Sequence, residues 1–353
     1  MRPEPIRIEP IFSPRIWGSR FLAPLFPQKA NLQEPLGEAW LTGVDCKIAT
    51  GPFAEKTLAE AWREMPSEWR GSDLWSTNEF PLLVKFIFPK DKLSIQVHPD
   101  DAYAALHEKA AGGRGKTEMW HIVSAEPGAQ LLAGLKPGVT KEKFRQGLAA
   151  HTLEDLFQSH PVHTGDTFFI PARTPHTIGA NMVVFEVQEY SDLTYRVYDY
   201  DRVDAQGKPR ELHIEKALDV MNFSAEPVCP LRTGIPMGHS GPACIHYLAA
   251  CRYFAVEKWK FESGSANGSL DPKRFEIVVV LKGSGHIRWD GGESHCEAGQ
   301  CWFLPATLGK YTLGSFPEAS ETLRVYVPDI VGFEKRAADK GFEEKVRRQF
   351  IFL

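Results

Sequence analysis

The chain has 353 residues, of which 43% are hydrophobic and 24% are charged, and its formal net charge at pH 7 is -4. This length allows two hydrophobic cores, and the composition is that of an ordinary soluble globular protein. The negative net charge and the lack of a dense lysine and arginine block argue against a nucleic-acid partner, and no apolar run is long enough to span a membrane.

The cysteines and the N-terminus indicate the compartment. The six cysteines are scattered without a Cys-x-x-Cys pair, which is typical of free thiols in a reducing cytosol rather than of a disulfide framework. Residues 1–9 have no apolar core and therefore do not have the pattern of a signal peptide. We expect a cytoplasmic protein.

The N-terminal quarter of the chain predicts short strands and loops, because residues 1–60 are rich in proline and glycine, with a helix over 58–65. Residues 81–88 are short, apolar and followed by Pro89, which predicts a buried strand. Lys85 interrupts this strand. Its side chain either extends to the rim of the sheet or faces a polar pocket.

The next predicted strand covers residues 93–98, where apolar and polar residues alternate. Ser94, Gln96 and His98 therefore share one face of the strand. A neutral imidazole suits zinc, and an amide oxygen can complete a mixed nitrogen and oxygen site. Taken alone, these residues also fit a half-exposed strand whose polar face lies in water.

A predicted helix over 101–111 leads into a glycine-rich segment. Its Gly115-Lys116-Thr117 invites comparison with a nucleotide phosphate loop, but that motif needs glycine at position 110, which is alanine here. The following residues predict a strand over 118–123 instead of the required helix, so we reject a nucleotide loop. A glycine-rich turn with a lysine can still hold a small phosphate.

In the strand over 118–123, Glu118 and His121 lie on opposite faces, so Glu118 can face a site only if His121 does not. Residues 140–158 predict two short helices. The segment 163–176 then predicts a Gly-Asp turn, an apolar strand and a proline-rich turn that ends at His176. The prolines make this turn rigid and fix the direction of the imidazole, as a metal ligand requires.

A strand over 182–190 is followed by residues 193–202, where aromatic and charged residues alternate and Arg196 lies among tyrosines. This segment can also be a surface strand with stacked aromatic rings. A helix over 211–221 precedes residues 224–242, which are rich in proline, glycine and serine and are interpreted as a linker. Beyond it, residues 243–353 predict a second all-β unit with a charged helical tail.

Two segments of the chain match each other. Residues 165–171 and 299–305 share a Gly-x5-Pro pattern with apolar residues before the proline, which resembles the second motif of the cupin superfamily of jelly-roll barrels. Five residues after the proline, the first copy has His176 and the second has Lys310, which cannot ligate a metal. The predicted fold is therefore mainly β, with two cupin-type jelly-roll β-barrels and a few short helices.

The predicted domains follow from this repeat. They are a catalytic metal-binding cupin domain over 1–223 that includes the short helical segment 140–158, a linker over 224–242, and a degenerate cupin domain without metal over 243–353. Only the first barrel is expected to hold a metal.

Residues 94–100, 115–120, 171–176 and 195–200 together resemble type I mannose-6-phosphate isomerases in their shorter bacterial form. Trp17-Gly18 and residues 37–40 match the opening of this family, so the resemblance covers nearly the whole chain. The resemblance implies a zinc-dependent aldose–ketose isomerase that interconverts mannose 6-phosphate and fructose 6-phosphate. The large helical insertion of longer relatives is reduced here to residues 140–158.

The resemblance also implies a residue for each part of the site. One Zn²⁺ per chain would be bound by Gln96, His98, Glu118 and His176. Arg196 and Lys116 would be catalytic, and Ser94, Lys85 and Lys116 would lie near the phosphorylated hexose. One carboxylate among neutral ligands leaves a zinc site with a net charge of about +1 and room for a substrate oxygen.

The isomerisation moves a proton between C1 and C2 of the sugar through an enediolate. A Lewis acid and a fixed guanidinium both stabilise the charge that develops on the two oxygens. The two histidines are occupied as ligands. The residue that transfers the proton therefore stays open among Lys116, Glu189, Asp199 and a metal-bound water.

Two other functions also fit parts of the pattern. A regulatory bicupin could bind a sugar phosphate without turnover, but such a sensor does not need four metal ligands and Arg196. An iron or manganese bicupin oxygenase or decarboxylase usually has a His-x-His ligand pair, and this chain has Gln96-x-His98. We expect a monomer or a weak homodimer.

Overall fold

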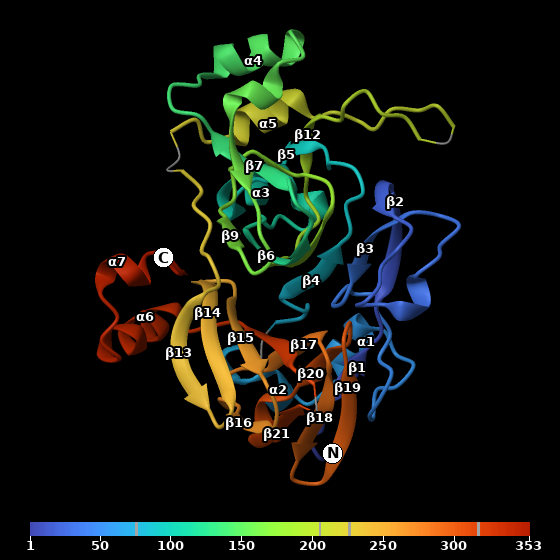
Figure 1. The fold of residues 1–353 in the computed structure, drawn as a ribbon, viewed down its shortest axis with the longest axis vertical. Coiled ribbons are helices and arrows are strands. Elements are labelled where there is room, and N and C mark those ends of the chain that lie inside the picture. The colour runs from blue at the N-terminus through green and yellow to red at the C-terminus, as the bar shows by residue number, and fades with distance from the viewer. Residues whose placement is uncertain (75–76, 205, 225–226, 316–317) are drawn as a thin grey trace.

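The computed structural model describes residues 1–353 except for 75–76, 205, 225–226 and 316–317. Two β-rich units lie one above the other along the long axis of the molecule (Figure 1). Each unit consists mainly of two sheets. The prediction of a mainly β protein with two cupin-type units is thus confirmed, although paired jelly-roll sheets take the place of closed rings of strands.

The larger sheet of the first unit has the strand order β2-β3-β4-β11-β6-β9. Its strands are β2 (Ile11–Ser19), β3 (Leu36–Trp40), β4 (Leu82–Ile87), β11 (Met182–Glu189), β6 (Glu118–Ala125) and β9 (Thr167–Ile170). The central strand β4 is buried along its whole length, because one face lies inside the unit and the other packs on the C-terminal unit. This position explains why its sequence is an almost continuous apolar run.

The smaller sheet of the first unit has the order β12-β5-β10-β7-β8. Its strands are β12 (Tyr195–Tyr198), β5 (Ile95–Val97), β10 (His176–Ile178), β7 (Gln130–Leu135) and β8 (Phe157–Pro161). Three of these strands carry motifs that the sequence analysis selected. The strand predicted over 93–98 is shorter than expected and covers only Ile95–Val97. At its C-terminal end, Pro99 has no N–H for the ladder, and the chain turns into the helix that begins at Asp101.

The C-terminal unit repeats this arrangement with an eight-stranded sheet in the order β1-β20-β17-β22-β15-β14-β13, and β23 also pairs with β14. Its strands are β1 (Ile6–Ile8), β20 (Cys301–Leu304), β17 (Glu276–Lys282), β22 (Ser320–Tyr326), β15 (Ala255–Phe261), β14 (Ala243–Cys251), β13 (Ile235–Ser240) and β23 (Ile351–Phe352). The second sheet contains β16 (Ser265–Ser269), β21 (Lys310–Ser315), β18 (Ser284–Trp289) and β19 (Gly292–Glu297). The two sheets enclose their own apolar core.

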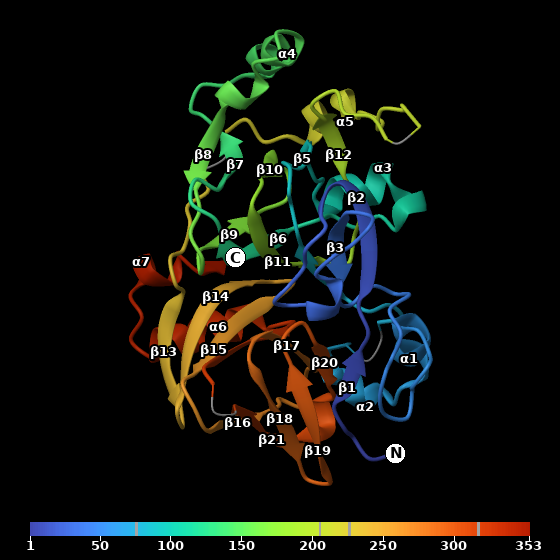
Figure 2. The same cartoon turned by 45° about the vertical axis from the view of Figure 1, so that its right-hand side comes forward.

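Short helices lie around these sheets. They are α1 (Leu58–Glu64), α2 (Ser67–Arg70), α3 (Asp101–His107), α4 (Lys141–Ala149), α5 (Ile214–Val220), α6 (Ile330–Asp339) and α7 (Glu344–Arg347). Thr57 and Glu60 form a capping box that begins α1, because each side chain bonds the other residue's backbone N–H. The predicted helical segment 140–158 forms α4 and a short 3-10 turn at one end of the molecule, before β8 (Figures 1 and 2).

One hydrophobic core joins the two units. Phe86 and Phe185 of the first unit belong to the same cluster of buried residues as Val279 and Leu323 of the second. The N-terminus also connects the units: residues 6–8, which the sequence analysis assigns to the first domain, pair with β20 in the C-terminal sheet. The units are therefore packed and hydrogen-bonded together.

The second half of the predicted linker differs from the expectation. Within 224–242, residues 235–240 form the edge strand β13, and residues 225–226 lie outside the described part of the chain. The pairing of β13 with β14 is shifted by a bulge between Pro236 and Gly238. An edge strand tolerates both residues, because its outer side makes no ladder hydrogen bonds. The high proline and glycine content therefore suggested a linker, although residues 235–240 form a strand.

No helix among the described residues is long and apolar enough to cross a membrane. All six cysteines are free thiols, as the spacing predicted.

Candidate active site and metal centre

The centre of the site is β5, which lies between β10 and β12. The register pairs Gln96 of β5 with His176 on one side and with Arg196 on the other. His98 follows β5 directly, and Glu118 begins β6 in the facing sheet. Segments that are far apart in the sequence are thus brought together by strand pairing and by the packing of one sheet on the other.

Both histidines have a fixed orientation. His98 Nδ1 lies 2.9 Å from the Leu193 carbonyl oxygen, and His176 Nδ1 lies 2.9 Å from the Thr174 carbonyl oxygen. A carbonyl can only accept, so each Nδ1 carries the proton and each Nε2 keeps its lone pair. Hydrogen bonds of this kind are the usual support of metal-binding histidines.

The free Nε2 atoms point at one carboxylate. His98 Nε2 lies 3.5 Å from Glu118 Oε2, and His176 Nε2 lies 3.3 Å from Glu118 Oε1. The ligand atoms of these three residues all lie within 4.8 Å of one another. The side-chain amide nitrogen of Gln96 is 3.3 Å from His176 Nε2, and a half-turn of the amide places its oxygen there instead.

The electrostatics of the cluster suit a cation. Burial lowers the pKa of His176 to about 3 and holds the pKa of His98 well below its usual range, so both imidazoles are neutral, the form in which histidine can bind a metal. Burial also raises the pKa of Glu118 to about 7, against the influence of the Lys116 ammonium. Glu118 Oε1 is buried without a hydrogen-bond partner. These donors fit a divalent metal of the zinc type, which would supply the missing partner of that oxygen.

A cavity of about 390 Å³ lies beside the cluster. All of the residues predicted to contact substrate line it: Ser94, Lys85, Lys116 and Arg196, together with Gln96. Five basic side chains and three acidic ones lie in its wall. This excess of positive charge suits a phosphorylated sugar, because a phosphate monoester carries close to two negative charges.

Lys85 faces this polar cavity, which decides between its two possible positions. Its Nζ lies 3.0 Å from Glu186 Oε1 and 3.7 Å from Glu38 Oε1, and its side chain is buried. These two carboxylates raise the pKa of Lys85 above its usual value despite its burial. The Lys85 ammonium is therefore present at all physiological pH values but shares its charge with two carboxylates.

Arg196 is paired differently from the other cations of the cavity. Its Nη1 donates to the Glu211 carbonyl oxygen over 2.9 Å, and its buried Nε has no partner among the described residues. By contrast, Arg15 bonds Glu38 and Arg210 bonds Asp199. Arg196 therefore keeps more of its hydrogen-bonding capacity for a ligand than these two arginines do.

Lys116 lies between the cluster and the cavity. Its Nζ donates to Glu118 Oε2 and lies 3.1 Å from His98 Nε2. The side chain is buried, and it also lines the cavity. Of the three side chains considered for proton transfer, Lys116 is thus the one that reaches both the histidine cluster and the cavity.

The other two candidate side chains lie away from the cavity. Glu189 accepts a hydrogen bond from the Thr117 backbone and is hydrogen-bonded to Asp101. Asp199 accepts from Arg202 and Arg210. Neither lines the cavity as described, so Asp199 acts on the site only by holding Arg210. His121 also points away from it, as the alternation of β6 predicted.

Several side chains that line the cavity were not predicted from the sequence, among them Arg15, Arg210 and His213. Arg15 precedes the Trp17-Gly18 motif on β2, which was a usable signal. Arg210 and His213 lie directly before α5, which begins at Ile214 and not at residue 211 as predicted, and no motif marks either residue. Only the folded chain brings them beside Arg196.

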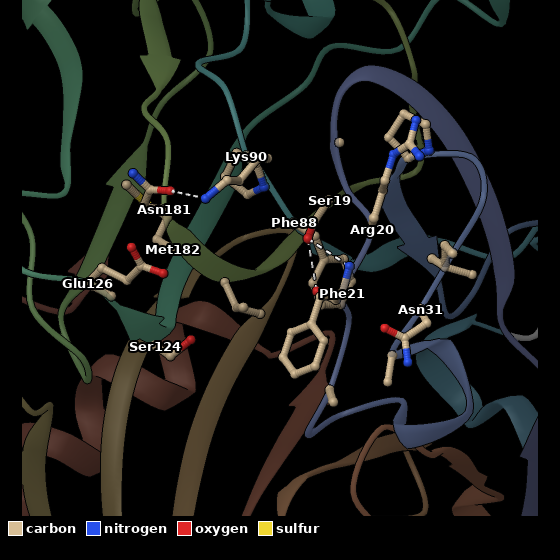
Figure 3. A pocket seen from close by; sticks show the side chains of 18 of the residues that line it. Ser19, Arg20, Phe21, Asn31, Phe88, Lys90, Ser124, Glu126, Asn181 and Met182 are labelled. Carbon is tan, nitrogen blue, oxygen red and sulfur yellow. Dashed lines mark hydrogen bonds between the residues drawn. The ribbon is translucent and has the colours of Figure 1, made fainter.

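A larger hollow of about 1050 Å³ lies elsewhere, between the loop after β2 and the ends of β4, β6 and β11 (Figure 3). It contains Arg20, Lys90 and Glu126 but none of the clustered histidines. Lys90 is already hydrogen-bonded to Asn181 over 3.2 Å. The hollow of larger volume is therefore not the cavity that lies beside the clustered histidines and Glu118.

Known families match both units of the chain. Residues 6–119 match the family described as phosphomannose isomerase type I, catalytic domain, and residues 244–326 match the mannose-6-phosphate isomerase cupin domain. The second range lies in the second β unit, and the first range covers β1 and the N-terminal part of the first unit.

Individual proteins match over most of their length. The probable mannose-6-phosphate isomerase GmuF of Bacillus subtilis is 36% identical over 88% of this chain and 96% of its own. The mannose-6-phosphate isomerase of Streptococcus mutans is 33% identical over 86% of this chain and 93% of its own. The crystal structure of the mannose 6-phosphate isomerase from Bacillus subtilis superimposes with a TM-score of 0.80 at 31% identity, covering 91% of this chain and 99% of that one. The chain belongs to the type I mannose-6-phosphate isomerase family.

Proposed function

We propose that this chain is a zinc-dependent isomerase that interconverts mannose 6-phosphate and fructose 6-phosphate through an enediolate. One Zn²⁺ per chain would be held by Gln96, His98, Glu118 and His176. The observation that carries the proposal is the pair of carbonyl bonds that directs both Nε2 lone pairs at Glu118 beside a basic cavity. The names of the relatives supply the substrate pair.

The cavity wall accounts for substrate binding in this proposal. Ser94, Lys85 and Lys116 would contact the phosphorylated sugar. Lys85 is held in place by Glu186 and Glu38, so its ammonium is fixed in direction before the substrate arrives. Such preorganisation favours binding because less side-chain freedom is lost.

Arg196 and Lys116 would carry the chemistry of this chain's own side chains. Zinc, when bound, supplies a Lewis acid next to the two reacting sugar oxygens. The Arg196 guanidinium offers paired donors that match two adjacent oxygens, and it would stabilise the charge of the enediolate. Lys116 Nζ reaches both Glu118 and the cavity. We assign to it the movement of a proton to and from the substrate.

The proposal also assigns a different function to each unit. Residues 1–223 would form the catalytic cupin domain, and residues 243–353 a degenerate cupin domain that holds no metal. The protein would act in the cytoplasm. The alternative is a bicupin that binds a sugar phosphate for regulation without converting it.

One experiment tests the proposal and separates it from its alternative. The metal-replete protein is incubated with mannose 6-phosphate, the appearance of fructose 6-phosphate is assayed, and metal content is measured on the same sample. We expect turnover with one equivalent of zinc, loss of turnover with a chelator, and recovery when zinc is added back. Binding of mannose 6-phosphate without product would favour the regulatory bicupin, and two metal equivalents or none would contradict the assigned site.

A further inference from the structure

A second cavity, of about 420 Å³, lies between the two units. On the side of the first unit it is lined by the loop at residues 22–25 and by His121, which points away from Glu118 on β6. On the other side it is lined by β15, β17 and β22. It shares the lining residues Phe88 and Ser124 with the larger hollow of Figure 3, so the two cavities adjoin each other.

A buried lysine lies in the wall of this cavity. Lys258 is 1% exposed, and its Nζ lies 3.4 Å from His121 Nε2. His121 Nδ1 in turn lies 2.9 Å from Thr167 Oγ1. Burial holds the pKa of His121 well below its usual range, so the ring is neutral and accepts one of the three N–H donors of the ammonium without balancing its charge.

No carboxylate of the described residues contacts Lys258 directly, and Glu321 stabilises its charge only from the other part of the cavity wall. Among the described residues, His121 is its one side-chain hydrogen-bond partner. Burial lowers the pKa of Lys258 to about 8. A buried cation without a counter-charge is costly, whereas its neighbour on the same face of β15, Val256, is apolar and fully packed.

More positive charge lies at the rim of the cavity. Lys260 follows Lys258 on the same face of β15, and Lys282 ends β17. Glu321 lies opposite both of them in the strand register, and Lys260 Nζ is 3.4 Å from its Oε1. Three lysines therefore line the cavity, and Glu321 is the one acidic residue among the described residues of its wall.

We propose that this cavity between the units binds a phosphoryl dianion, either inorganic phosphate or a small phosphate ester, with Lys258 at its floor and Lys260 and Lys282 at its rim. The excess of about two positive charges over Glu321 matches such a dianion. The bound oxygens would accept the two N–H donors of Lys258 that His121 leaves free. Because the site lies on both units, its ligand would hold them together.

Equilibrium dialysis of the zinc-loaded protein against labelled inorganic phosphate tests this proposal. Phosphate is expected at two places per chain, the isomerase cavity and the cavity between the units. Lys258→Met, which keeps the length of the side chain and removes its charge, should reduce the stoichiometry from two to one. Inhibition of isomerase turnover by phosphate should stay the same in this variant. Lys335→Met, on the exposed face of α6, is the matched control and should keep both phosphates.

A second variant covers the case in which Lys258→Met fails to fold. Lys260→Met combined with Lys282→Met changes only the rim and should weaken the second phosphate by about tenfold or more. Displacement of that phosphate by glycerol phosphate would assign the site to phosphate esters, and its retention would assign it to free phosphate. A single phosphate that Lys258→Met retains, or two phosphates in every variant, overturns the proposal, whereas a single phosphate that Lys258→Met loses supports this cavity and contradicts phosphate binding in the isomerase cavity.

Discussion

The two units have corresponding strands, but each stabilises a buried glutamate between its two sheets in a different way. In the first unit, Glu118 of β6 pairs with the residue directly before Pro171. In the second, Glu276 of β17 pairs with the residue directly before Pro305. The two glutamates thus occupy corresponding positions. Yet Glu118 Oε1 has no hydrogen-bond partner, whereas both oxygens of Glu276 accept from Arg324.

A second correspondence explains where this arginine comes from. In the first unit, Lys85 of β4 lies opposite Glu186 of β11. In the second, Glu257 of β15 lies opposite Arg324 of β22, so the charges of the pair are exchanged between the strands. Arg324 then bonds Glu257 over 3.0 Å as well as Glu276, and the carboxylates raise its pKa although the side chain is buried.

The comparison shows two ways of stabilising a buried carboxylate. The second unit supplies a guanidinium from its own chain, which satisfies the oxygens and leaves no position for a ligand. The first unit surrounds Glu118 with neutral imidazoles and leaves an oxygen to be completed from outside. The ion pairs of Arg324 with Glu257 and Glu276 stabilise the fold, whereas the unpaired oxygen of Glu118 remains available for a ligand.

The largest effect is expected from removing one of the histidines that surround Glu118. His176→Ala removes the proposed zinc ligand but leaves the apolar core of the unit, so the protein should fold, lose zinc, and lose turnover by about 1,000- to 10,000-fold, or about 4 to 5 kcal/mol. Zinc content, circular dichroism and turnover are measured together. Lys310→Ala, five residues after the second proline, is the matched control and should change none of them. A His176→Ala protein with full zinc content would make His176 a structural residue.

Breaking the ion pairs of Arg324 should affect stability instead of activity. Arg324→Met leaves Glu257 and Glu276 buried without their counter-charge, which should lower the free energy of unfolding by roughly 3 to 5 kcal/mol. Urea denaturation measures this loss, and turnover per folded molecule should stay at the wild-type value. Adding Glu257→Gln and Glu276→Gln should restore much of the stability, because the buried charges are then gone. An unchanged unfolding midpoint in Arg324→Met would contradict this account.

Arg196 tests whether the first unit uses its own guanidinium in catalysis. Arg196→Ala should lower turnover by about 100- to 1,000-fold, or about 3 to 4 kcal/mol, with zinc content unchanged and the Michaelis constant altered less. Arg196→Lys should restore little, because an ammonium lacks the paired donors. Arg288→Ala, on the exposed strand β18 of the second unit, is the control. If turnover survives while substrate affinity collapses, Arg196 is a phosphate anchor and Lys116 is the better catalytic candidate.

Local patterns in the sequence were sufficient for much of this architecture. The alternation around Gln96 and His98, the opposite faces of Glu118 and His121, and the rigid turn before His176 are all encoded within a few residues. Strand periodicity also located most central strands, because these strands are buried and apolar.

What the sequence could not reveal depends on pairing over long distances. Glu257 and Arg324 are 67 residues apart, and nothing near either residue indicates that they meet across a sheet. Arg210 enters the cavity because Asp199 holds it, in a segment without periodicity. The N-terminal strand β1 joins the far unit, and no local pattern states which sheet edge a short strand will complete.

The smallest effect concerns the carboxyl groups of the buried Glu189, which ends β11, and of Asp101, which begins α3. The second unit has the apolar Val327, directly after β22, at the position that corresponds to Glu189. Burial, and then the nearby Asp101 carboxylate, raise the pKa of Glu189 to about 8. Arg252 and the Tyr253 hydroxyl face the same Asp101. Between about pH 4.5 and pH 8 the folded protein therefore keeps a proton that the unfolded chain has lost. The free energy of unfolding must fall as pH rises through this window, because the folded state binds more protons.

Glu189→Gln removes this titration while it keeps an oxygen for the Thr117 N–H and gains an N–H for Asp101. The variant should therefore gain stability relative to the wild type as pH rises, by roughly 3 kcal/mol between pH 5 and pH 8. Urea denaturation at both pH values measures the difference. Glu68→Gln, on the exposed face of α2, should show no such pH dependence. A Glu189→Gln protein that becomes less stable than the wild type toward pH 8 would mean that Glu189 is ionised in the folded state, held by Thr117 and Arg252 instead of sharing a proton with Asp101.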